Sequence, residues 1–187
     1  MISVLLLTSC IQEPLSEEDR ETPYFDLPTL VKQQVQWLDS LNPPVVIRAS
    51  ISGEEETETL QKDSAAWAET LALFRRSNIN QPVLQGQYET TDSVLVEQNL
   101  QLRTYRSDQA EIPYLKVYYR DTISNVSRIE TAFQEDNLLY STYREMWMTF
   151  SPYQGQPRLT AFATTGKQKM MLRDSVTYVA HGEVQLE

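Results

Sequence analysis

Residues 139–150 read Leu-Tyr-Ser-Thr-Tyr-Arg-Glu-Met-Trp-Met-Thr-Phe and decide the fold class. The polarity of the side chains alternates along this run with a period of two. In an extended strand every second side chain lies on the same side. The same period returns throughout the chain beyond Pro82, in segments separated by turn residues such as Asp136-Asn137. Because short connections join antiparallel neighbours, the second half of the chain is predicted to be an antiparallel meander.

The period-two segments predict eight strands in this meander. Asp92-Ser93, Ser151-Pro152 and Gly166 are three of the turn signals that divide them. The strands are expected at residues 85–91, 94–106, 115–120, 126–133, 139–150, 158–164, 167–173 and 176–184. A sheet of this kind packs one face on a core and leaves the other face in water.

The chain before the meander has a helical period at two places. Apolar residues recur at helical spacing between Leu30 and Leu41, after the N-cap candidate Asp26 and before the helix-breaking pair Pro43-Pro44. Val45–Ile51 alternates as a strand does, and Ser52-Gly53 is a hairpin turn that leads to an acidic return strand.

A second helix is expected after Asp63 or Ser64, with one apolar stripe formed by Trp67, Leu71 and Phe74. Two N-terminal helices that flank a β-hairpin, followed by a long antiparallel meander packed on them, make an α+β fold. The length permits one such domain, and we assign it to residues 23–187.

The amino terminus, Met1 to Cys10, is an apolar run that ends in small residues and the only cysteine of the chain. Leu7-Thr8-Ser9-Cys10 resembles the lipobox of bacterial lipoproteins, in which the cysteine is acylated and the preceding peptide is removed. The resemblance implies a signal-peptide remnant at 1–9 and a lipidated acidic tether at 10–22. It also implies a protein bound to the outer membrane through lipid on Cys10, facing the periplasm or, alternatively, exposed at the cell surface.

Four further stretches are similar to a group of uncharacterised lipoproteins of Bacteroidota. They are Tyr24-Phe25-Asp26-Leu27, Asn42-Pro43, Ile51-Ser52-Gly53, and the stretch from Asp63 through Trp67, Leu71 and Phe74 to Ile79-Asn80-Gln81-Pro82. The similarity runs from Tyr24 to Pro82 and continues through the strands. Because no activity is known for that group, the resemblance implies lineage and fold, and no function.

Charge and composition exclude several classes of partner. The net charge of -10 argues against nucleic acid, since phosphate binding depends on lysine and arginine. One cysteine cannot form an internal disulfide. With five glycines there is no phosphate-cradling loop, so no cofactor is expected.

Catalytic and metal-binding motifs are also scarce. His181 is the only histidine, which argues against a histidine-rich zinc site, and no Gly-x-Ser-x-Gly nucleophile motif occurs. Glu54-Glu55-Glu56 lacks the residue order of a calcium loop and is interpreted as a solvated strand. Glu130, Glu135 and Asp136 are abundant carboxylates from which a hydrolase pair could be drawn.

Aromatic residues are the clearest binding signal. Tyr114, Tyr118, Tyr143 and Trp147 are the candidate ligand-binding residues, because tyrosine and tryptophan combine stacking area with a polar group. They are also common strand residues, so cross-strand packing is the alternative. Leu115, Val117 and Tyr119 are expected to face the helices, which leaves Tyr114 and Tyr118 on the wet face.

Three functions remain open at this point. The first is a non-enzymatic binding or assembly module whose partner is an envelope protein or a glycan. The second is a carrier that holds an apolar ligand in a half-barrel-like cavity. The third is a hydrolase that uses strand carboxylates.

Replacing Cys10 by serine tests the anchor. Cys10→Ser removes the thiol that would accept the lipid, so the protein should move from the membrane fraction to the soluble fraction. Immunoblots of the two fractions measure the change. Membrane association equal to that of the parent would contradict lipidation at Cys10.

Overall fold

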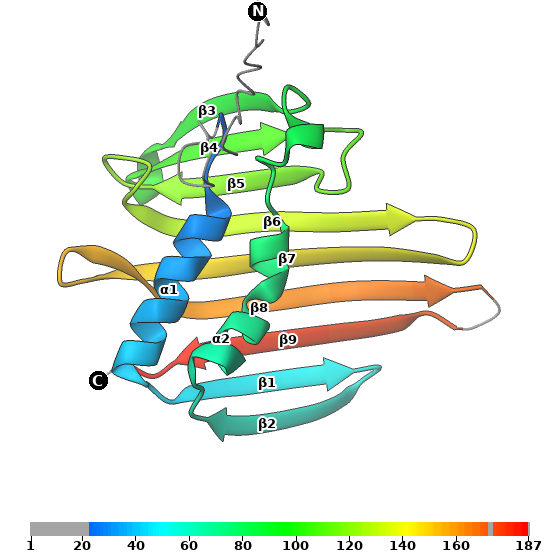
Figure 1. The fold of residues 1–187 in the computed structure, drawn as a ribbon, viewed down its shortest axis with the longest axis horizontal. Helices are drawn as coiled ribbons and strands as arrows, with labels where there is room; N and C mark the ends of the chain where they lie inside the picture. Colours follow the sequence, from blue (N-terminus) through cyan, green and yellow to red (C-terminus); the bar gives the residue numbers. More distant parts are fainter. Residues whose placement is uncertain (1–22, 172–173, 187) are drawn as a thin grey trace, which may run out of the picture.

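Nine antiparallel strands form one sheet, and the helices lie across one of its faces (Figure 1). The computed structural model describes residues 23–171 and 174–186. The strands are β1 (Val45–Ile51), β2 (Glu54–Leu60), β3 (Glu89–Leu95), β4 (Leu100–Arg106), β5 (Tyr114–Tyr119), β6 (Val126–Asp136), β7 (Tyr140–Tyr153), β8 (Gln156–Met170) and β9 (Val176–Val184). Their spatial order is β2-β1-β9-β8-β7-β6-β5-β4-β3. The predicted α+β fold is confirmed.

The first helix, α1 (Leu27–Leu41), begins and ends where its sequence predicts. The side chain of Asp26 accepts a hydrogen bond of 3.0 Å from the backbone N–H of Thr29, which satisfies one free donor of the first turn. At the other end Asn42 adopts the left-handed conformation that closes many helices, and Pro43 follows.

The second helical segment is divided into α2 (Ser64–Thr70) and α3 (Ala72–Arg76), because the backbone leaves the helical region at Leu71. The expected single helix is therefore two short ones. Asp63 caps α2 by accepting from the N–H of Ala66 at 2.8 Å. Trp67, Leu71 and Phe74 are all buried, so the predicted stripe is confirmed.

The core fills the space between the helices and the sheet. Trp67 meets the ring of Phe162 on β8 edge to face, with ring centres 6.3 Å apart. The buried amide of Gln34 fastens α1 to the same strand, since it donates to the carbonyl of Pro157 and accepts from the N–H of Leu159 at 2.9 Å. A buried amide with both groups bonded fixes the position of the helix over the sheet.

Gly166 lies inside β8 and is not a turn, so the two strands expected at 158–164 and 167–173 are one strand in the described residues. It pairs directly with Tyr178 on β9, and a Cβ built on Gly166 would lie 2.3 Å from that tyrosine ring. The glycine therefore gives room to a cross-strand aromatic ring. The sequence pattern alone does not separate this use of glycine from a turn.

Two other turn assignments were wrong. Asp92-Ser93 lies within β3, and the chain turns at Asn99, whose φ is 51°. Ser151-Pro152 lies near the end of β7, and the turn follows at Gln154-Gly155, where both φ angles are positive. In each case the tight turn occurs where the backbone adopts positive φ, which Asn and Gly tolerate well.

The N-terminal hairpin joins the sheet through the last strand of the chain. Val45 pairs with Val184 and Ile51 with Tyr178, so β1 lies antiparallel beside β9. This long-range pairing places the acidic strand β2 at one edge of the sheet and β3 at the other. The exposed glutamates of β2 agree with their interpretation as a solvated strand.

Two of the stretches that resemble the lipoprotein group contact each other. The side chain of Asn80 accepts from the backbone N–H of Tyr24 at 3.0 Å and donates to the carbonyls of Tyr24 and Phe25. The Tyr24 hydroxyl accepts in turn from the N–H of Gly86. These residues hold the entry to α1 against the segment after α3, which is a structural role.

Replacing Trp67 by alanine tests the packing of α2 on the sheet. The side chain has no exposed surface, so Trp67→Ala should lower the free energy of unfolding by about 3–5 kcal/mol. Trp37→Ala is the matched control, because Trp37 is half-buried on α1 and should cost less. Chemical denaturation measures both variants. If Trp67→Ala and Trp37→Ala lower the free energy of unfolding equally, Trp67 is not a core residue.

Candidate functional site

The face of the sheet opposite the helices, here called the open face, carries the candidate aromatic residues. On β5 the side chains of Leu115, Val117 and Tyr119 are buried toward the helices, as predicted. Alternation therefore puts Tyr114 and Tyr118 on the open face. Cross-strand register through β6 puts Trp147 of β7 on the same face.

Tyr114, Tyr118, Tyr143 and Trp147 form the corners of a four-sided aromatic frame. Two corners lie on β5 and two on β7, each pair four residues apart, and β6 runs between them. Tyr143 is 43% exposed, and the other three are half-buried. The structure thus brings the four candidates together on one surface.

Glu130 of β6 lies inside the aromatic frame and holds three of its neighbours. It accepts from the hydroxyl of Tyr118 at 3.0 Å and from Nε of Arg128 at 2.7 Å. Nζ of Lys116 lies 3.6 Å from the same carboxylate. Since Glu130 is only 25% exposed, these bonds fix the side chains around it.

Arg128 is held on two sides. Its guanidinium lies 4.9 Å from the ring centre of Trp147, a cation–π contact, while its Nε is bound to Glu130. Beyond Trp147 the ring of His181 follows at 5.4 Å, so an aromatic row crosses from β7 to β9. The outcome is a guanidinium of fixed orientation that is still 36% exposed.

Two β-bulges open a hollow beside the aromatic frame. Tyr118, Arg128 and Thr149 stand opposite one another on β5, β6 and β7, and the register shifts immediately beyond this row. Ser127 and Thr160 are the extra residues of the two bulges. Bulges re-aim side chains and are frequent beside functional sites.

This bulge hollow has a volume of about 530 Å³, within the range of ligand pockets. Most of its lining side chains carry hydrogen-bonding groups. The lining residues are Gln98, Leu100, Tyr118, Ser127, Arg128, Glu130, Thr149, Phe150, Ser151 and Thr160. The hydroxyl groups of Thr149 and Thr160 lie 3.3 Å apart, so they form a paired polar wall.

The tyrosines of the open face keep their protons well above neutral pH. Burial and the negative charge of Glu130 raise the pKa of Tyr118 to about 12. Burial and the neighbouring Glu145 raise the pKa of Tyr114, and burial and its hydrogen bond to Glu145 raise that of Tyr143. Each phenol therefore remains a neutral hydrogen-bonding group beside a carboxylate.

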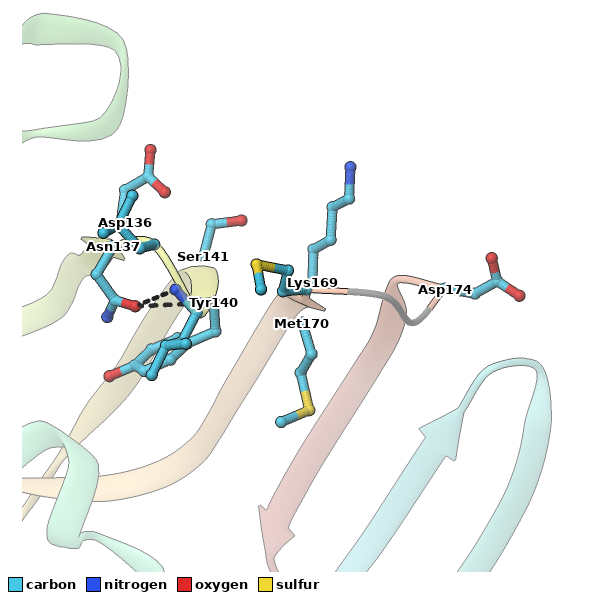
Figure 2. Close-up of a pocket in the computed structure, with 10 residues that line it drawn as sticks. Asp136, Asn137, Tyr140, Ser141, Lys169, Met170 and Asp174 are labelled. Carbon is cyan, nitrogen blue, oxygen red and sulfur yellow. Dashed lines mark hydrogen bonds between the residues drawn. The ribbon is translucent and has the colours of Figure 1, made fainter.

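A second hollow, of about 780 Å³, lies where the β6–β7 hairpin and the end of β8 meet. Figure 2 shows its lining, with the Asn137 side chain accepting from the backbone N–H groups of Leu139 and Tyr140. Leu138 is 92% exposed there, and Met170 is also exposed. Turn residues and apolar tips line this hollow, and no sequence-predicted site residue other than Asp136 lies in it.

Of the carboxylates considered for a hydrolase, Glu135 and Asp136 line one hollow near the end of β6, whereas Glu130 lies apart from them. Alternation along β6 puts Glu130 and Glu135 on opposite faces of the sheet. Asp136 is six residues from Glu130, roughly 20 Å along the strand. A glycosidase pair needs a separation of about 5–9.5 Å.

Residues 23–171 and 174–186 show neither a cluster of metal-ligating side chains nor a membrane-spanning helix. That part of the chain contains no group of three or more His, Cys, Asp or Glu residues that could hold a metal ion. None of its helices is long and apolar enough to cross a membrane. Cys10, the predicted lipidation site, lies outside the described residues.

Sequence reasoning missed Arg128, Ser127, Thr149 and Thr160. Their contribution depends on two register shifts, and a period-two pattern does not show where a bulge occurs. The one available signal was the position of Arg128 two residues before Glu130 in a strand, which places both on one face.

Comparisons with protein-family models, with curated proteins and with solved structures found no match to this chain. The resemblance to Bacteroidota lipoproteins therefore stays a prediction from the residues that carry it.

Tyr118→Phe tests the link between Tyr118 and Glu130 through pH. An unfolded tyrosine ionises near pH 10, whereas folded Tyr118 keeps its proton to about 12, so its contribution to stability is lost as pH rises between these values. The free energy of unfolding of the parent should fall toward that of the variant over this range. Urea titrations at stepped pH measure it, and a constant difference from pH 8 to 12 would contradict the assignment.

Proposed function

We propose that the chain is a lipid-anchored binding module of the bacterial envelope that engages its partner through the open face. Cys10 would hold it to the outer membrane, with the domain in the periplasm or, alternatively, at the cell surface. The observation that carries the proposal is the aromatic frame and bulge hollow, which join exposed ring area to a fixed guanidinium. Tyrosine, tryptophan and arginine are the residues that dominate binding energy at interfaces.

The distribution of charge favours the open face as the binding surface over the rest of the domain. The chain carries a net charge of -10, whereas the centre of the open face combines Lys116 and Arg128 with Glu130. An acidic exterior keeps copies of the protein apart and in solution. A locally compensated surface is the place where a partner can approach without that repulsion.

The core favours a binding module over a carrier of apolar ligands. Trp67, Leu115, Ile129, Met148 and Leu159 have no accessible surface at all. A side chain without accessible surface borders no void large enough for a water molecule. An apolar ligand would therefore need a cavity elsewhere than the space these residues fill between helices and sheet.

The contacts of Glu130 favour binding over hydrolysis. Its two oxygens accept from Tyr118 and Arg128, and Lys116 stands beside them. A general acid or base must have an oxygen available to the substrate proton that it transfers. Bonded in this way, Glu130 organises the surface.

Capture experiments with Tyr118→Ala and Trp147→Ala test the proposal. Each should weaken capture of partners from solubilised envelope by about tenfold or more, because each removes an anchor of the open face. Thermal melts should show that both variants remain folded. Quantitative mass spectrometry of the captured material gives the measurement.

Leu138→Ala is the control, because Leu138 is an exposed apolar residue at the hairpin end and lies outside the open face. Its capture should equal that of the parent. Loss of capture with Leu138→Ala, and none with the open-face variants, would move the binding surface to the hairpin end. Unfolding of both open-face variants would show that the rings serve packing alone.

A further inference from the structure

The bulge hollow presents one cation in a fixed plane. Nε of Arg128 is bound to Glu130, and its guanidinium is held over the ring of Trp147. Within residues 23–171 and 174–186, its two terminal nitrogens Nη1 and Nη2 have no hydrogen-bond acceptor. A planar pair of N–H donors of this kind matches the two oxygens of a carboxylate.

The local charge also fits a singly charged anion. Close to the hollow, Lys116 and Arg128 contribute two positive charges and Glu130 one negative charge, an excess of one positive charge, while Glu145 of the same face is bonded to Tyr143 further along β7. Since the whole chain is strongly negative, this excess is a local feature of the open face. A ligand with one carboxylate at this point would restore neutrality.

The remaining wall of the hollow is made of hydroxyl and amide groups. The hydroxyls of Thr149 and Thr160 donate to backbone carbonyls of the sheet and can accept from a ligand, whereas Ser127 and the amide of Gln98 can donate and accept. Sugar hydroxyls also donate and accept, so they pair with such a wall more completely than apolar groups do. Half-buried Leu100 supplies the apolar contact that the C–H face of a sugar ring needs.

The position of the hollow argues against an extended peptide as the ligand. Peptides that bind sheets usually add a strand to an edge, where backbone groups are unpaired. The bulge hollow extends from Leu100 on β4 to Thr160 on β8, and these strands have neighbours on both sides, while the edges of the sheet are β2 and β3. A ligand there must be recognised by side chains.

We propose that the bulge hollow binds a carboxylated sugar of an acidic glycan, with the carboxylate on Arg128 and the ring hydroxyls on Thr149, Thr160 and Gln98. This inference rests on the proposed function and names the ligand class of the same surface. Trp147 positions the guanidinium, and Glu130 fixes it through Nε. The neighbouring Tyr118 hydroxyl borders the bound sugar.

Calorimetric titration of the full-length chain in detergent with a galacturonate trisaccharide tests the proposal. Three probes are compared with it: its methyl ester, the galactose trisaccharide of the same linkage, and a hexapeptide that contains three glutamates. The galacturonate should bind, and the two neutral sugars should bind at least about tenfold more weakly, since they lack the carboxylate. The peptide should not bind measurably.

Variants locate the binding. Arg128→Gln should weaken galacturonate binding by about 10- to 100-fold. Arg128→Lys keeps the charge beside Glu130 and Trp147 but loses the paired donors, so it should weaken binding by about tenfold. Arg48→Gln is the matched control, an exposed open-face arginine paired with Glu183 outside the hollow, and should bind as the parent does.

Equal binding of the ester and the acid would overturn carboxylate recognition, and preferential binding of the peptide would overturn the sugar. A parent that binds no probe, while Trp147→Ala still abolishes capture from envelope, would refute this inference and leave the proposed function standing. If the parent binds no probe and Trp147→Ala captures as much from envelope as the parent does, the proposed function is refuted as well. Because Arg128→Lys keeps the positive charge beside Glu130 and Trp147, it should remain folded, so weaker binding by this variant reports the loss of recognition and not the loss of folding.

Discussion

The structure depends on one constraint: α1, α2 and α3 form one layer, which covers only one face of a nine-stranded sheet. Apolar side chains of β5 to β8 must therefore alternate with side chains that face water. Trp67 from α2 and Gln34 from α1 fasten the helices to β8 and so define which face is covered. No helix among residues 23–171 and 174–186 covers the other face, so many of its side chains are in contact with water.

On the open face, contacts among the side chains of the sheet shield them from water only in part. Glu130 accepts hydrogen bonds from Tyr118 and Arg128, and the guanidinium of Arg128 makes a cation–π contact with the ring of Trp147. The register then shifts at two bulges immediately beyond the row of Tyr118, Arg128 and Thr149, and the hydroxyl of Thr149 pairs with that of Thr160, the extra residue on β8. The bulge hollow is a consequence of register, because each bulge adds one residue that has no partner across the strand.

Much of the fold could be predicted from the sequence, because α1, the stripe on α2 and α3, and the face of Leu115 all follow from local periods. The pairing of β1 with β9 could not, since no local pattern specifies which distant edge a hairpin joins. Gly166 was misread as a turn because its role depends on Tyr178 across the strand. The aromatic corners of the site were predicted from residue type, whereas Arg128 and Thr160 required the bulges. The lipid anchor on Cys10 and the partner stay predictions.

Hydroxyl-radical footprinting of the protein in intact envelope and after purification tests the central claim most directly, because it reads side-chain accessibility without knowledge of the partner. The account predicts that Tyr143 and Trp147 are oxidised more slowly in the envelope than in the purified protein. Trp37 on the helical side and Met170 at the hairpin end should react equally in both. Protection of Trp37 or Met170, with Tyr143 and Trp147 unchanged, would contradict the open face as the binding surface.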